Sequence, residues 1–126
     1  MVGGLKGQLI VSCQASEKEP FFTPDSMARY ARSARDGGAA GIRANSPEDI
    51  RAIRNAVNLP VIGIQKRMMD DGRILITPTV EDAGALIQAG AIAVAVDCTR
   101  RGQRYGALER LARIKKKFQM EVLADI

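Results

Sequence analysis

The chain has 126 residues, of which 46% are hydrophobic and 26% charged, so it has the length of one globular domain and not the composition of a disordered segment. It has no histidine and two cysteines, which excludes Ser-His and Cys-His nucleophiles and leaves too few ligands for a structural zinc site. No stretch approaches the roughly 18 apolar residues that a membrane span needs, and the first residues contain no apolar signal core.

Short apolar runs, rich in Ile, Val and Ala, recur along the chain. Buried parallel strands have this appearance, and five are predicted, at residues 9–14, 39–45, 61–66, 91–97 and 121–126. A short extra strand is predicted at residues 74–78, and Pro78 indicates that it lies at an edge or ends early.

Helix start signals separate these runs. Thr23, Ser46 and Thr79 are each followed by proline or acidic residues and are predicted to be helix N-caps. The helices that they begin are predicted to end at about Asp36, about Val57 and Gln88. Apolar spacing predicts a fourth helix at residues 107–118. The segment between the fourth strand and this helix is expected to be a polar, basic loop.

Strands and helices alternate at intervals of roughly 25 to 30 residues, which is typical of β/α units with parallel strands. A closed (β/α)8 barrel typically needs about 200 to 250 residues. We therefore expect an incomplete TIM barrel with about the first five β/α units. Residues 1–126 would form a single domain, the amino-terminal portion of a longer barrel that is truncated after the fifth strand. An open, flavodoxin-like sheet is the alternative, although no glycine-rich phosphate loop supports it.

A polar residue stands near the carboxyl end of each predicted strand. Because alternate side chains share a face, the last inward-facing residues are expected to be Gln14, Arg43, Lys66, Asp97 and Asp125. Each could simply be a satisfied polar group at a strand end. Two cations, two carboxylates and an amide together predict a polar site, at the edge where α/β barrels perform their chemistry.

The net charge of +5 would suit either nucleic acid or an anionic small molecule. Basic residues cluster at 100–104 and 115–117, but no aromatic residues interleave them to stack on bases, and a solvated helix face explains the second cluster. We therefore expect a small-molecule partner, with no nucleic acid and no membrane. Cys13 and Cys98 are expected to be free thiols in a reducing cytoplasm.

Several motifs, with matching spacing along essentially the whole chain, resemble the N-acylmannosamine-6-phosphate 2-epimerase family. They are Ser12-Cys-Gln14, Gly41-Ile-Arg43-Ala-Asn45-Ser46, Pro60-Val-Ile-Gly-Ile-Gln-Lys66-Arg67, Ile76-Thr-Pro-Thr79 and Ala124-Asp125-Ile126. The resemblance implies a bacterial TIM-barrel isomerase of sialic acid catabolism, without metal or organic cofactor. It would convert N-acetylmannosamine 6-phosphate to N-acetylglucosamine 6-phosphate.

The resemblance also implies roles for the residues at the predicted edge. The family's catalytic lysine matches Lys66, and its substrate contacts match Gln14, Arg43 and Asp125. Asp97 is also similar and is assigned to substrate binding without a firmer role. The family's second catalytic residue, a glutamate beyond the fifth strand, and its phosphate-binding loops have no counterpart here. These departures argue against activity of the isolated chain.

The implied reaction removes the proton from C2 of the open-chain sugar and returns a proton to the other face. Lys66 can act as the base only when it is neutral. Arg43 would contact sugar oxygens or stabilise developing negative charge, and Gln14 can both donate and accept hydrogen bonds. Asp125 would bind hydroxyl groups or orient Lys66.

Two alternatives remain open at this point. Lys66 could instead form a Schiff base, as in a TIM-barrel sugar-phosphate lyase or class I aldolase. The chain could also be a catalytically silent fragment that associates with itself through an open sheet edge. Homo-oligomer formation is left open in either case.

Overall fold

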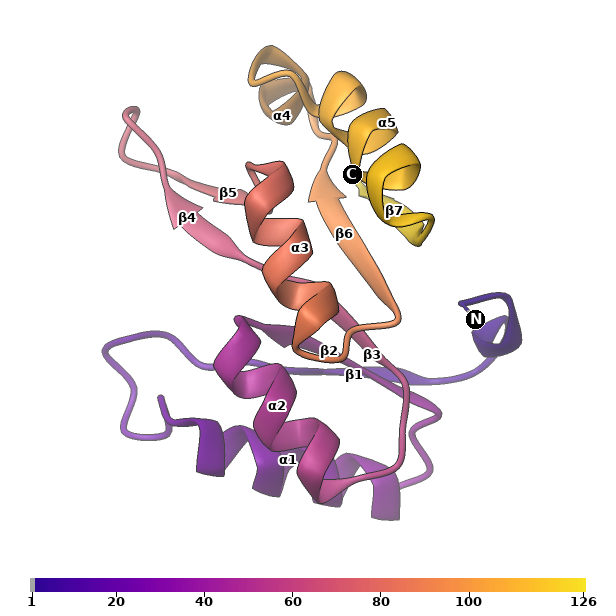
Figure 1. Ribbon diagram of the computed structural model, residues 1–126. Coiled ribbons are helices and arrows are strands. Elements are labelled where there is room, and N and C mark those ends of the chain that lie inside the picture. Colours follow the sequence, from indigo (N-terminus) through magenta and orange to yellow (C-terminus); the bar gives the residue numbers. More distant parts are fainter. Residues whose placement is uncertain (1) are drawn as a thin grey trace.

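Five parallel strands form the framework of the computed structural model, which describes residues 2–126 (Figure 1). The strands lie side by side in chain order, and they are β1 (Ile10–Cys13), β2 (Gly41–Asn45), β3 (Val61–Ile64), β6 (Ala93–Asp97) and β7 (Glu121–Asp125). Consecutive order is the order of a β/α barrel, whereas a flavodoxin-like sheet has the order 2-1-3-4-5. The prediction of parallel β/α units is therefore confirmed, and the flavodoxin-like alternative is wrong.

The four long helices begin and end within a residue of their predicted bounds. They are α1 (Pro24–Asp36), α2 (Pro47–Ala56), α3 (Val80–Gln88) and α5 (Ala107–Phe118), and a short 3-10 turn, η1 (Val2–Leu5), precedes β1. The first three have the expected side-chain caps, because Thr23, Ser46 and Thr79 accept hydrogen bonds from the amide three residues later.

The expected loop after β6 is instead a short helix, α4 (Arg100–Arg104). Thr99 caps it by accepting a hydrogen bond from the Gly102 amide at 3.1 Å. Gly102 is required there, since a Cβ at this position would lie 2.1 Å from the carbonyl oxygen of Asp97. The basic composition of the segment concealed this Thr99 cap in the sequence.

The third strand is shorter than predicted, because β3 ends at Ile64 and not at Lys66. Lys66 opens β4 (Lys66–Met68), which pairs antiparallel with β5 (Ile74–Ile76) in a hairpin that projects away from the main sheet (Figure 1). The extra strand is thus confirmed, and it lies in a two-stranded sheet of its own. None of the helices in residues 2–126 is long and apolar enough to cross a membrane.

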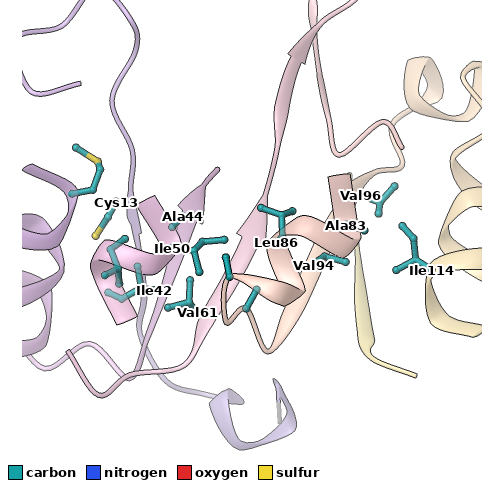
Figure 2. Close-up of a cluster of buried hydrophobic side chains, with 14 of the residues drawn as sticks. Cys13, Ile42, Ala44, Ile50, Val61, Ala83, Leu86, Val94, Val96 and Ile114 are labelled. Carbon is teal, nitrogen blue, oxygen red and sulfur yellow. The ribbon is translucent and has the colours of Figure 1, made fainter. Parts of the chain in front are cut away.

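The two faces of the main sheet contact different parts of the chain. The face toward the helices carries the larger core, in which side chains of β2, β3 and β6 meet those of the helices (Figure 2), including Ile42, Ala44, Val61, Val94, Val96, Ile50, Leu86 and Ile114. The opposite face carries a smaller apolar cluster of Leu5, Ile62, Ile64 and Ala95, with Ala40, Ile76 and Leu123 against it. Alternation along each strand therefore separates helix-facing residues from those that face the inside of the partial barrel.

Gly63 of β3 lies where the sheet meets α2 and α3. A Cβ there would lie 2.9 Å from Ile50 Cδ1 and 3.2 Å from Leu86 Cβ. We predict that Gly63→Ala lowers the free energy of unfolding by about 1–3 kcal/mol, measured by chemical denaturation, because the core has no room for the methyl group. Gly37→Ala is the control, since its φ is −81° and its nearest contact would be 3.4 Å. Equal losses in the two variants would contradict this packing argument.

Candidate active site

A hollow of about 590 Å³ lies at the carboxyl edge of the sheet, beside the ends of β1, β2 and β3. Its polar lining includes Gln14, Asn45 and Lys66, which come from three different chain segments. Its apolar lining includes Phe22 of the β1–α1 connection and the cross-strand pair Met68 and Ile74 of the hairpin, all three exposed. The hollow is therefore amphipathic, with an amine and two carboxamides among its lining groups.

The backbone of Lys66 is held in place from two sides. Its N–H donates to Asn45 Oδ1 at 2.9 Å, which ties it to the end of β2. The preceding residue, Gln65, accepts from the Thr77 amide at 2.7 Å and donates its own amide to Thr77 Oγ1 at 3.2 Å. These bonds replace the ladder hydrogen bonds of a continuing strand, which explains why β3 ends before Lys66.

Two non-glycine residues with positive φ flank this segment. Ser46 has φ 82° and Thr77 has φ 51°, and Thr77 is a fully buried β-branched residue. Such backbone conformations are rare and strained for these residues, and they persist where surrounding contacts determine them. They concentrate at functional sites, which agrees with their place on either side of Lys66.

Two arginines anchor the hairpin that Lys66 begins. Near its base, Arg67 Nη2 donates to Asp82 Oδ1 of α3 at 2.8 Å. Near its tip, Arg101 of α4 donates from Nε and Nη2 to the two carboxylate oxygens of Asp71, each at 2.6 Å, and from Nη1 to the Ile74 carbonyl at 2.9 Å. A bidentate guanidinium–carboxylate pair fixes orientation as well as distance. The wall formed by the hairpin is therefore tied to α3 and α4.

Arg43 and Asp125 form an ion pair on the inner face of the sheet, between Arg43 Nη2 and Asp125 Oδ2. β2 and β7 are separated by β3 and β6, so the two strands would lie roughly 14 Å apart in a flat sheet. Two side chains that rise from the same face of a flat sheet would have to lie almost fully extended across β3 and β6 to meet. The contact therefore agrees with a curved sheet, and it brings two of the predicted residues together.

The other two predicted residues have different surroundings. Gln14 lines the hollow together with Lys66, and its Nε2 donates to Ser12 Oγ. Asp97 is buried beside Asp125 in the strand register, but its Oδ1 accepts hydrogen bonds from the backbone amide and the hydroxyl of Thr99, at 3.2 and 2.6 Å. Its observed contacts thus belong to the start of α4.

Sequence reasoning did not single out Asn45, which lines the hollow and accepts the hydrogen bond from the Lys66 amide. Its place two residues after Arg43 on β2 is the signal that could have found it, because alternation puts both side chains on the inner face. Among residues 2–126, no group of three or more His, Cys, Asp or Glu side chains is arranged to hold a metal ion.

Polar side chains from three chain segments thus meet in a hollow at the carboxyl edge of β/α-barrel units. A model of the NanE family, described as "Putative N-acetylmannosamine-6-phosphate epimerase", matches residues 27–126. The chain therefore belongs to this family.

Curated relatives and solved structures agree with this assignment. The chain is 44% identical over its full length to a "Putative N-acetylmannosamine-6-phosphate 2-epimerase" of Clostridioides difficile, of which it covers 57%. It is 43% identical to a "Bifunctional enzyme NanE/NanK" of Brucella melitensis, of which it covers 24%. The chain thus spans about half the length of the single-function relatives it matches, and less of the bifunctional ones.

The N-acetylmannosamine-6-phosphate 2-epimerase from Clostridium perfringens has a similar structure, with a TM-score of 0.83 and 37% identity over 95% of this chain and 53% of that one. A mandelate oxidase, at 19% identity, a TM-score of 0.65 and coverage of 98% and 44%, shows a likeness of fold alone. The chain is accordingly a partial TIM barrel, as the sequence predicted.

The Asp71–Arg101 pair leads to a pH prediction. The hydrogen bond from Arg101, before any other cause, lowers the pKa of Asp71 from 3.8 to about 2. Because the pKa is lowered on folding, the stabilising contribution is complete above pH 3.8 and is lost as the pH falls through about 2. We predict that the Asp71 carboxyl ¹³C shift titrates with a midpoint near 2.

In Arg101→Lys this midpoint should return toward 3.8, because the bidentate contact is lost. Arg104→Lys is the control, since Arg104 is exposed on the same helix. A midpoint near 3.8 in the unaltered chain would contradict the bidentate Arg101–Asp71 contact.

Proposed function

We propose that the protein to which this chain belongs converts N-acetylmannosamine 6-phosphate to N-acetylglucosamine 6-phosphate, with Lys66 as the base at C2. The observation that supports this most directly is the rigid placement of Lys66 in a hollow with Gln14 and Asn45, within a chain of the epimerase family. We further propose that residues 1–126 are the amino-terminal domain portion of that barrel.

The proposed reaction begins with the open-chain sugar in the hollow. Neutral Lys66 takes the C2 proton, the C2–H electron pair forms the C1=C2 bond, and the carbonyl electron pair moves onto the C1 oxygen. A second acid of the completed protein, or solvent, gives a proton to the opposite face of C2 while the oxyanion electron pair re-forms the carbonyl. Lys66 then releases its proton to solvent, which completes the inversion. A positioned base of this kind typically contributes about 10²–10⁴-fold to the rate.

The ion pair on the inner face fits a role in substrate binding. Asp125 holds the Arg43 guanidinium through Nη2, and the remaining N–H groups of Arg43 can donate to substrate oxygens. Gln14 adds a carboxamide at the neighbouring strand end. Asp97 remains a proposed substrate contact, although its Oδ1 contacts the cap of α4.

Proton exchange at C2 tests the proposal directly. The substrate is incubated in deuterium oxide and followed by NMR, with the chain alone and with the chain completed by the carboxyl-terminal half of the Clostridioides difficile relative. Deuterium at C2 together with the epimer would support the proposal. Absence of exchange in the completed protein would refute it.

We predict that Lys66→Met in the completed protein lowers kcat by about 10²–10⁴-fold, because the base is lost. The far-UV circular dichroism should stay unchanged, because the side chain is half-buried at the edge of the fold. Lys116→Met is the control, since Lys116 is exposed on α5. Near wild-type turnover in Lys66→Met would exclude Lys66 as the base. A borohydride-trapped adduct on Lys66 would favour a Schiff-base lyase instead.

The free, buried thiols of Cys13 and Cys98 support a cytoplasmic location, which we propose together with a small-molecule substrate and no nucleic-acid partner. Salt-dependent retention of the protein on DNA would contradict the latter.

A further inference from the structure

Asn45 is the last residue of β2 and lies opposite Ile64 of β3 in the sheet register. Ile42 and Ala44 are fully buried in the helix-facing core, so alternation turns Arg43 and Asn45 to the inner face. The half-buried Asn45 side chain lines the same hollow as Lys66. Its position therefore places a carboxamide beside the backbone of Lys66, the proposed base.

The orientation of the Asn45 carboxamide follows from its contact with Lys66. A backbone N–H can only donate, so the group that meets the Lys66 amide at 2.9 Å is the oxygen, Oδ1. The other end of the carboxamide, Nδ2, carries two N–H donors that point elsewhere. Hydrogen bonding thus determines an orientation that atomic positions alone leave ambiguous.

The Nδ2 group of Asn45, a half-buried residue, is not completely buried. In the described part of the chain no protein acceptor takes its hydrogen bonds, and the buried side-chain polar atoms without a partner there both belong to Arg110. Nδ2 is therefore not enclosed, and the open space that Asn45 lines is the hollow. It offers a neutral hydrogen-bond donor to whatever occupies that space.

The backbone beside Asn45 holds this arrangement in place. The next residue, Ser46, has φ 82° and donates its amide to the Ile64 carbonyl at 2.9 Å. This bond and the bond from Lys66 to Asn45 Oδ1 cross-link the end of β2 to the chain on either side of Gln65. A strained residue held by such contacts is typical of a functional site.

We infer that Asn45 serves the epimerase reaction proposed above in two ways. Its Oδ1 fixes the backbone from which the Lys66 side chain extends, and its Nδ2 donates a hydrogen bond to the substrate oxygen that becomes negative when C2 is deprotonated. The inference rests on the proposed function for the second role and on the structure alone for the first.

The donor role follows from where charge develops. When Lys66 removes the C2 proton, the electron pair ends on the C1 oxygen, which is two bonds from C2. Asn45 and Lys66 line the same hollow, so a pose that brings C2 to the amine can also place the C1 oxygen beside Nδ2. A preorganised neutral donor keeps its own protons and stabilises the oxyanion, and removal of one such donor typically costs about 10²–10³ in kcat.

Two substitutions at one position separate the two roles. Asn45→Asp keeps an oxygen for the Lys66 amide and removes the donor, whereas Asn45→Ala removes both. The completed protein is used for kinetics, and residue-specific amide hydrogen exchange of Lys66 is measured by NMR. Asn55→Asp, on the exposed surface of α2, is the matched control.

Asn45→Asp is expected to lower kcat by about 10²–10³-fold across the pH range while Lys66 amide exchange stays as in the wild type. Asn45→Ala should lower kcat similarly and also accelerate exchange at Lys66. The new carboxylate of Asn45→Asp could also change the rate through its charge, by altering the protonation of Lys66. The full pH–rate profile is therefore recorded, so that a charge effect can be told from the loss of the donor. A shifted profile with an unchanged maximum would show a charge effect and overturn the donor role.

A wild-type maximal kcat in Asn45→Asp would likewise overturn the donor role, and unchanged Lys66 exchange in Asn45→Ala would overturn the anchoring role. The proposed function itself fails if the wild-type protein exchanges no C2 proton. In that case the donor role fails with it, and Lys66 amide exchange still decides whether Asn45 anchors the lysine.

Discussion

The curvature of the five-stranded sheet is the constraint on which the rest of the structure depends. Helices pack against one face through a continuous apolar core, and the strands follow one another in consecutive order. The opposite face lines the inside of the partial barrel. It carries a small apolar cluster, and polar side chains extend from the carboxyl ends of its strands. The Arg43–Asp125 ion pair, formed across two intervening strands, agrees with this curvature.

A second constraint acts where β3 ends. Ladder hydrogen bonding stops after Ile64, and bonds to Asn45 and Thr77 take over. The chain then turns into a hairpin that Arg67 and Arg101 hold against α3 and α4. The amine of the proposed site is thus mounted on a short irregular segment whose backbone is cross-linked on both sides. A loop without these contacts would be free to sample many positions at an entropic cost to catalysis.

The polar groups at the edge divide into those that face the hollow and those that serve the fold. Gln14, Asn45 and Lys66 line the hollow, whereas the Asp97 carboxylate contacts the start of α4. Strand ends in parallel sheets supply both kinds of residue, because each helix that follows also needs a cap. Position at a strand end does not show whether a polar residue faces the hollow or caps a helix. For Asp97, the hydrogen bond from Thr99 shows that its carboxylate contacts the start of α4.

The sequence by itself determined the β/α alternation, the bounds of the long helices and the inward direction of Arg43, Asp97 and Asp125. These features depend on local chemistry, namely the Thr23, Ser46 and Thr79 caps and the two-residue period of a strand. Only the tertiary structure decided that Lys66 begins a hairpin, that residues 100–104 form a helix, and that Asn45 holds Lys66. The first and the last depend on hydrogen bonds between segments brought together by folding, such as the bond between Lys66 and Asn45, which stand 21 positions apart. The helix at 100–104 has a local cap at Thr99, and its Arg101 also bonds Asp71, 30 positions away. No periodicity within a single segment records such a contact.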